Sequence, residues 1–264
     1  MRSLVISATS AAFMVATNTA SLAQVKEVRY PAVKVELAEA YKPDAAFEKM
    51  RKAFAEAVAK KDAQALFSLV GPTFVWLSQT EGGVSDQFDY GGDALHNFKV
   101  VFGFRESGKD TDGGVADGPF WDALTAFAAD KTFFVDAGAG SLVCGPTVAT
   151  IVDADAFEKA KATIGADDSV DWYFTVADTP ATAGPGSGAP VGRVNQVALP
   201  VLDTHPPVPA QGEPVPPTHL QVLLPVGRKG WIPISAAIPL ETDRLCYALT
   251  PTGERKISRF DQAG

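Results

Sequence analysis

The segment from Leu220 to Leu240, LQVLLPVGRKGWIPISAAIPL, carries the clearest structural pattern in this chain of 264 residues. Apolar side chains recur at every second position, at Leu220, Val222 and Leu224. This pattern predicts a strand with one buried face. A turn is expected from Pro225 to Gly230, because proline presets one backbone angle and glycine adopts the positive φ values of tight reversals.

The residues after this turn predict a return strand beginning at Trp231. Pro233 has no N–H to donate, so this strand is expected to end there or to lie at an edge. Ser235–Ala237 suits a single helical or 3₁₀ turn, after which Ile238 and Leu240 resume an extended path. The segment therefore predicts a β-hairpin followed by one short helical turn.

This hairpin resembles the bacterial SH3-like family, which commonly carries a G-x-x-G-W-[VI] hairpin near its end. The residues at matching positions are Gly227, Gly230, Trp231 and Ile232. The resemblance extends more loosely over residues 171–260. It implies a small β-barrel that binds an extended ligand, in this family often a peptidoglycan peptide or another component of the cell envelope.

Four residues are the candidate ligand contacts of such a module: Trp231, Tyr247, Arg228 and Lys229. The two aromatic rings would line a groove, and the two cations at the tip of the hairpin would add charge. The alternative interpretation places Trp231 in the barrel core and leaves Arg228 and Lys229 as solvated turn residues.

The first part of the chain predicts mainly helices. Apolar side chains recur at three- and four-residue steps after Asp44, and Asp44 and Asp62 are candidate N-caps. Further helices are expected over 93–102, 119–129 and 153–164, with an aromatic strand over 73–77. We therefore expect an α+β protein with a mainly helical domain over 24–168 and an SH3-like barrel over 169–264. A cystatin-like first domain is the alternative.

Composition and the first residues predict an exported protein. Residues 1–23 have the charged start, apolar run and small-x-small cleavage site of a signal peptide, and no cysteine follows for a lipid anchor. The formal net charge is −8, which argues against nucleic acid as the partner. No later stretch is long and apolar enough for a membrane span. A periplasmic or secreted location is expected.

The chain has two cysteines, Cys144 and Cys246. An even number in an exported protein predicts a disulfide, which would tie the region before the barrel to the last strands of the barrel. Two buried free thiols are the alternative.

The sequence shows no recognisable catalytic, metal or cofactor site. The three histidines, His96, His205 and His219, lack the spacing of a helical zinc pair, and no G-x-S-x-G nucleophile motif occurs. We therefore predict a non-enzymatic protein without metal or cofactor, with peptidoglycan or an envelope protein as partner. The alternative is a small-ligand-binding protein or enzyme with a pocket in the first domain, lined by the aromatic segments 73–77, 98–104 and 120–127.

A proline-rich stretch lies between the middle strands of the predicted barrel. Seven prolines occur between residues 200 and 217. Because proline cannot donate to a β-ladder, this stretch is expected to be an extended loop. It is interpreted as an insertion in the barrel, with a polyproline ligand for a partner as the alternative.

Overall fold

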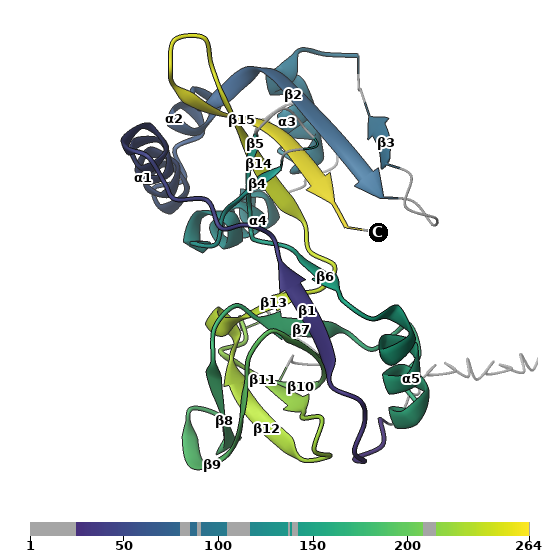
Figure 1. Cartoon of the computed structure of the whole chain (residues 1–264). Helices are drawn as coiled ribbons and strands as arrows, with labels where there is room; N and C mark the ends of the chain where they lie inside the picture. Colours follow the sequence, from purple (N-terminus) through teal and green to yellow (C-terminus); the bar gives the residue numbers. More distant parts are fainter. Residues whose placement is uncertain are drawn as a thin grey trace, which may run out of the picture.

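The computed structural model describes residues 25–79, 85–88, 91–104, 117–136, 138, 142–207 and 215–263. These residues form two lobes, each built on one β-sheet, with strand β1 (Val33–Leu37) at the junction (Figure 1). The predicted signal peptide and residues 208–214 of the proline-rich stretch lie outside the described residues.

The first lobe is a six-stranded sheet with the order β3-β2-β15-β14-β5-β4. β15 runs parallel to β2, and the other neighbours are antiparallel. The strands are β2 (Val70–Gln79), β3 (Ser85–Phe88), β4 (Phe134–Asp136), β5 (Leu142–Gly145), β14 (Arg244–Leu249) and β15 (Arg255–Gln262). The helices of this lobe are α1 (Ala45–Ala59), α2 (Ala63–Phe67), α3 (Ala94–Val101) and α4 (Asp117–Ala129).

Four of the helices begin directly after an aspartate. In each case the carboxylate accepts a hydrogen bond from a backbone N–H three residues later, which satisfies a donor that the helix leaves free. The capping residues are Asp44, Asp62 and Asp93 for α1 to α3, and Asp153 for α5 (Ala154–Ile164). The apolar faces of α1, α3 and α4 then form the core of the first lobe with Tyr247 and Ile257 from the sheet.

The second lobe is a sheet with the order β13-β7-β10-β11-β12-β8-β9, to which β1 and β6 (Ala149–Ile151) are joined. Its other strands are β7 (Trp172–Thr175), β8 (Thr179–Gly184), β9 (Ser187–Val194), β10 (Val197–His205), β11 (His219–Leu223), β12 (Lys229–Pro233) and β13 (Ala237–Pro239). Helix α5 packs on it through Ala160 and Ile164.

The hairpin predicted from residues 220–240 is confirmed as β11, β12, the 3₁₀ turn η2 (Ile234–Ala236) and β13. Leu220 and Ile232 are register partners, and both are buried. Gly227 has φ of 80°, and a Cβ at this position would lie 2.8 Å from the backbone nitrogen of Arg29. Glycine is therefore required both for the turn and for the close approach of residues 28 and 29.

The predicted fold class is wrong. The described residues are 40% strand and 26% helix, and they form two open sheets in place of a mainly helical domain and a small SH3-like barrel. The individual helices were predictable because their periodicity is strong. The first-lobe sheet was missed because β4 and β5 have three and four residues, and because its central strands come from the end of the chain.

The sheets do not divide at the expected boundary between residues 168 and 169. β1, β6 and α5 precede this boundary and belong to the second lobe, whereas β14 and β15 follow it and complete the first. The chain therefore passes between the lobes three times, before α1, between β5 and β6, and between β13 and β14 (Figure 1).

The predicted disulfide between Cys144 and Cys246 is present. The two residues are register partners on β5 and β14, and both are fully buried. The bond therefore links two neighbouring strands of the first lobe. The expectation that it ties the region before a barrel to the last strands of that barrel is wrong, because β5 and β14 belong to the same sheet.

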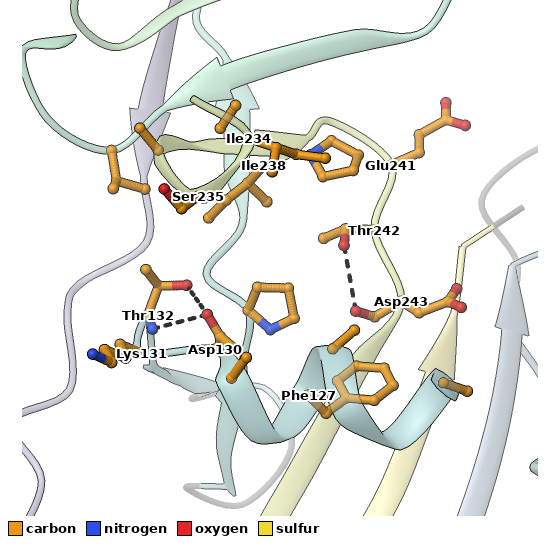
Figure 2. A pocket seen from close by; sticks show the side chains of 18 residues that line it. Phe127, Asp130, Lys131, Thr132, Ile234, Ser235, Ile238, Glu241, Thr242 and Asp243 are labelled. Atoms are coloured by element: carbon orange, nitrogen blue, oxygen red, sulfur yellow. Dashed lines mark hydrogen bonds between the residues drawn. The ribbon is translucent and has the colours of Figure 1, made fainter. Parts of the chain in front are cut away.

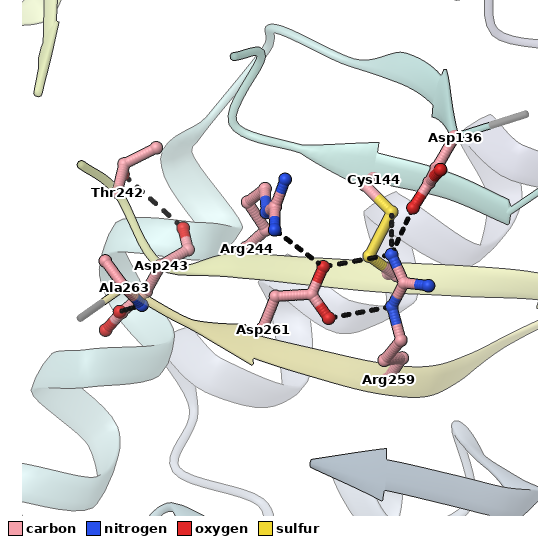
Figure 3. Close-up of polar contacts among 9 residues, drawn as sticks. Asp136, Cys144, Thr242, Asp243, Arg244, Arg259, Asp261 and Ala263 are labelled. Carbon is pink, nitrogen blue, oxygen red and sulfur yellow. Dashed lines mark hydrogen bonds and ion pairs between the residues drawn. A yellow bond between two sulfur atoms is a disulfide. The ribbon is translucent and has the colours of Figure 1, made fainter. Parts of the chain in front are cut away.

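A buried ion network lies beside this disulfide (Figure 3). The side chain of Asp261 is 4% exposed; its Oδ2 lies 2.9 Å from Nη2 of Arg259 and 3.1 Å from Nη2 of Arg244. Arg259 also forms an ion pair with Asp136. Burial raises the pKa of Asp261, and the charges of the two arginines oppose this effect. Because an unpaired buried charge is strongly destabilising, these contacts fix the strands β14 and β15 together.

Among the described residues, no helix has the length and apolarity needed to cross a membrane.

Candidate functional site

A cleft of about 950 Å³ lies between the two lobes. One wall is the C-terminal half of α4, and the opposite wall is η2, β13 and the segment that leads to β14 (Figure 2). The lining residues are 123, 126, 127, 129–132, 146, 176, 234–239 and 241–243. Ligand sites in proteins are commonly mostly apolar clefts of this size at the interface between two structural units.

The α4 wall is open because its outward face consists of small side chains. Trp121, Leu124 and Phe127 are buried in the first-lobe core. Ala123, Ala126 and Ala129, at three-residue steps on the other face, are exposed to the cleft. Alanine on this face leaves space that larger side chains would fill.

The opposite wall is formed by Ile234, Ile238 and Pro239, with the hydroxyl-bearing Ser235 beside them (Figure 2). Ile238 is a register partner of Phe174 on β7, so this wall is held by the sheet of the second lobe. A ligand between the walls would contact both lobes at once.

Asp130 is the acidic residue on the inner surface of the cleft. Its Oδ1 accepts hydrogen bonds from the backbone nitrogen of Thr132 at 3.0 Å and from Thr132 Oγ1 at 2.7 Å (Figure 2). Its Oδ2 is buried and has no hydrogen-bond partner among the described residues. Burial raises the pKa of Asp130, while the bonds from Thr132 and the charge of Arg51 act in the opposite direction.

Arg51 fixes the end of α4 from behind the cleft wall. Its Nη2 donates to the carbonyl oxygens of Phe127 at 2.7 Å, Ala128 at 2.9 Å and Asp130 at 3.0 Å. Its Nη1 donates to the hydroxyl of Tyr247 at 2.8 Å. A cation on the last carbonyls of a helix satisfies acceptors that the helix leaves free and complements the helix dipole. Arg51 therefore fixes the wall that carries Asp130.

The structure does not bring the four predicted ligand contacts together. Tyr247 is 1% exposed in the core of the first lobe, where burial raises its pKa to about 12. It packs against Phe47 with ring centroids 5.4 Å apart. Trp231 lies on β12 in the second lobe, so the two rings do not share a groove.

Trp231 is partly exposed on the outward face of the second sheet. It is the register partner of Gln221 and lies 6.1 Å from the ring of His205, while the next residue, Ile232, is fully buried on the inward face. The alternative interpretation of Trp231 as a core residue therefore does not describe its position, and its role in binding stays a prediction.

Arg228 and Lys229 are at the tip of the hairpin, as expected, and both have intramolecular partners. Arg228 donates to the carbonyl oxygen of Val191, and Lys229 forms an ion pair with Glu27 at 2.8 Å. The cationic tip is thus engaged with the first described residues of the chain and with β9.

Two of the three histidines lie side by side. His205 and His219 are register partners on β10 and β11, and Nδ1 of His219 lies 3.0 Å from the hydroxyl of Thr218. Within the part of the chain that the structure describes, however, no group of three or more potential ligands is placed to hold a metal ion.

The sequence analysis did not identify the cleft or Asp130. One signal was present: alanines at three-residue steps, Ala123, Ala126 and Ala129, ending at an aspartate. Such a face predicts open space beside a helix. The opposing wall was not predictable, because it depends on how the second lobe docks against the first.

Comparison of the chain with known protein families, with curated proteins and with solved structures finds no match. The functional assignment consequently depends on the geometry of the molecule itself.

Proposed function

We propose that this protein is a non-enzymatic carrier or sensor that binds a small, mainly apolar ligand in the cleft between its lobes. The observation that carries the proposal is the cleft itself, whose volume of about 950 Å³ suits one small molecule. Its walls are the alanine face of α4 and the isoleucines of η2 and β13. Burial of a ligand's apolar surface between them would supply the binding free energy.

The polar groups of the cleft support binding over catalysis. Catalytic sites need a nucleophile or a proton donor and acceptor held within hydrogen-bond reach of one another. Asp130 is hydrogen-bonded to Thr132, and Ser235 lies on the opposite wall. No hydrogen bond recorded among the described residues joins Ser235 to a base.

The buried disulfide is compatible with an extracellular or periplasmic protein. Together with the leader-like first 23 residues, it supports the proposal that the ligand is met outside the cytoplasm.

The test is to fill the cleft and measure the loss of binding. Ala126 is exposed on the cleft wall, so Ala126→Trp places an indole in the ligand space without entering the core of the first lobe. Naphthylmethanol is a neutral apolar probe of suitable size, and its binding to the protein is measured by isothermal titration and by saturation-transfer NMR. We expect binding to wild type and at least a tenfold weaker affinity in Ala126→Trp.

Ala53→Trp is the matched control, because Ala53 is exposed on α1 and does not line the cleft. This variant should bind the probe as wild type does. Equal binding to wild type and Ala126→Trp would place the probe elsewhere and refute the proposal, and so would absence of binding to wild type.

A second candidate function follows from Trp231. A partly exposed tryptophan beside His205 and Gln221 on an open sheet face is suited to contact an extended ligand, since tryptophan is frequent in the centres of binding surfaces. The resemblance of this hairpin to SH3-like modules supports peptidoglycan or an envelope protein as that ligand.

Co-sedimentation with insoluble cell-wall sacculi tests this second candidate. Wild type should pellet, and Trp231→Ala should remain in solution while retaining its far-UV circular dichroism. Arg228→Ala reports whether the hairpin tip contributes. If wild type does not pellet, the peptidoglycan ligand is excluded.

A further inference from the structure

The two lobes have separate apolar cores. One cluster of buried side chains belongs to the helices and sheet of the first lobe, and two others belong to the second lobe. A small fourth cluster lies around the disulfide and includes Ala38 and Val148, which are residues of the crossing segments. Among the described residues, none of these clusters joins a helix or strand of one lobe to one of the other. Two units without a large shared apolar interface are expected to move relative to one another.

The charged contacts follow the same division. Each ion pair recorded among the described residues lies within one lobe, such as Lys229 with Glu27 in the second and Arg244 with Asp261 in the first. The relative position of the lobes therefore depends mainly on the three segments that cross between them.

Two of these crossings form a two-stranded ribbon. Leu37 is the register partner of Ala149, and the backbone nitrogen of Ala38 donates to the carbonyl oxygen of Val148 at 3.0 Å. The third crossing is the single segment 240–243, between β13 and β14. Hinges in proteins are usually a few residues in loops or at the ends of elements, and a ribbon of two strands twists more readily than a wide sheet.

Both connections border the cleft. Pro146, next to the ribbon, and residues 241–243 of the single segment are among its lining residues. Figure 2 shows Thr242 between the wall that carries Phe127 and the wall that carries Ile238. Because these two walls belong to different lobes, bending at the connections changes the distance between them.

The cleft has room for the walls to approach one another around a ligand. Its volume of about 950 Å³ is at the upper end of the range of roughly 300–1,000 Å³ for ligand sites, and a bicyclic molecule fills only part of it. Approach of the walls would bury more of the apolar surface of the ligand. A ligand shifts a conformational equilibrium by the difference between its affinities for the two states, so a ligand that touches both walls favours the closed state.

We infer that the two lobes close on the ligand by bending at the ribbon of residues 37–38 and 148–149 and at the segment 240–243. This inference rests on the proposed function. The alanine face of α4 and the isoleucines of η2 and β13 approach one another, and water is excluded from between them. The distance between the lobes therefore reports whether the cleft is occupied, which is the property that a sensor needs.

Distances between paired spin labels, measured by double electron–electron resonance, test the inference. Asp122 on α4 and Ala177 after β7 are exposed, belong to different lobes and do not line the cleft. Labels are attached to cysteines engineered at these two positions, since Cys144 and Cys246 are buried and bonded to each other. Saturating naphthylmethanol should shorten the mean distance between the labels by more than about 2 Å and narrow its distribution.

A label pair within one lobe is the matched control. Ala53 on α1 and Asp122 on α4 are both exposed in the first lobe, so their distance should not change when the probe is added. Ala126→Trp in the pair that spans the cleft should abolish the response to the probe. Isothermal titration of each labelled protein shows whether it binds naphthylmethanol as the unlabelled protein does.

The outcomes separate this inference from the proposed function, because binding and distance are measured independently. If naphthylmethanol binds, and binding is lost in Ala126→Trp, but the distance between the lobes does not change, closure is overturned and the proposed function stands. Equal changes in the two label pairs would indicate rearrangement within the first lobe and would also overturn closure. If the probe does not bind in the cleft, both proposals fail.

Discussion

Replacement of Arg51 by methionine should be one of the most destabilising single substitutions in this protein. The guanidinium donates to three carbonyl oxygens at the end of α4 and to the hydroxyl of Tyr247, at distances between 2.7 and 3.0 Å. It also lies 4.9 Å from the ring centroid of Phe133, within the range of a cation–π contact. Methionine retains the apolar stem but none of these contacts.

The expected loss follows from the acceptors that remain. The hydrogen bonds to Tyr247 and Phe127 are buried, so the substitution leaves two buried acceptors without a donor, and each costs roughly 1–3 kcal/mol. The carbonyl oxygens of Ala128 and Asp130 are only partly buried, so water can replace part of their hydrogen bonding. The total is about 3–5 kcal/mol in the free energy of unfolding. For a chain of this length this corresponds to a Tm lower by about 10 °C.

Denaturation in urea and thermal unfolding, both followed by circular dichroism, measure this change. Arg51→Lys should lose less than Arg51→Met, because lysine keeps the charge but not the planar fork of donors. Lys52→Met is the control: Lys52 is exposed and its contact with Glu56 is 4.0 Å long, so its loss should change stability by less than about 0.5 kcal/mol. A loss below about 1 kcal/mol for Arg51→Met would refute the view that Arg51 holds the α4 wall.

Three further predictions concern the first lobe. Replacing both Cys144 and Cys246 by serine should lower the free energy of unfolding by about 2–5 kcal/mol, measured in guanidinium chloride, because the bond closes a long loop across the sheet; an unchanged midpoint would contradict this. Asp261→Asn leaves Arg259 without its buried carboxylate and should cost about 3–5 kcal/mol by the same assay. The pKa of Tyr247 is raised from 10.0 to about 12, so its contribution to stability is fully present below pH 10 and is lost as the pH rises through 12. Between pH 10 and 12, the free energy of unfolding of Tyr247→Phe should therefore fall by about 2–3 kcal/mol less than that of wild type. The same pH dependence in both proteins would contradict the raised pKa of Tyr247.

Local structure could be predicted from the sequence to a large extent. Asp44 and Asp62 cap helices, the aromatic strand lies within β2, and the hairpin ends in a 3₁₀ turn as its residues indicate. These features depend on neighbouring residues, whose periodicity and capping chemistry are readable from a single sequence.

The assembly of the sheets could not be predicted in the same way. β15 pairs in parallel with β2, which lies about 180 residues earlier in the chain, and no local pattern specifies such a partner. The cleft depends on this assembly, because its walls are α4 and η2, from different lobes. Asp130 is therefore recognisable as a candidate only after the lobes are in place.

The position of the last two strands has a consequence for the order of folding during synthesis. β14 and β15 lie between β2 and β5 in the first-lobe sheet, so a nascent chain that lacks them has two separate pairs, β2 with β3 and β4 with β5. Cys144 has no disulfide partner until Cys246 is made. The second lobe needs no strand after β13, whereas the first lobe, although all its helices precede β13, closes only when nearly the whole chain has been synthesised.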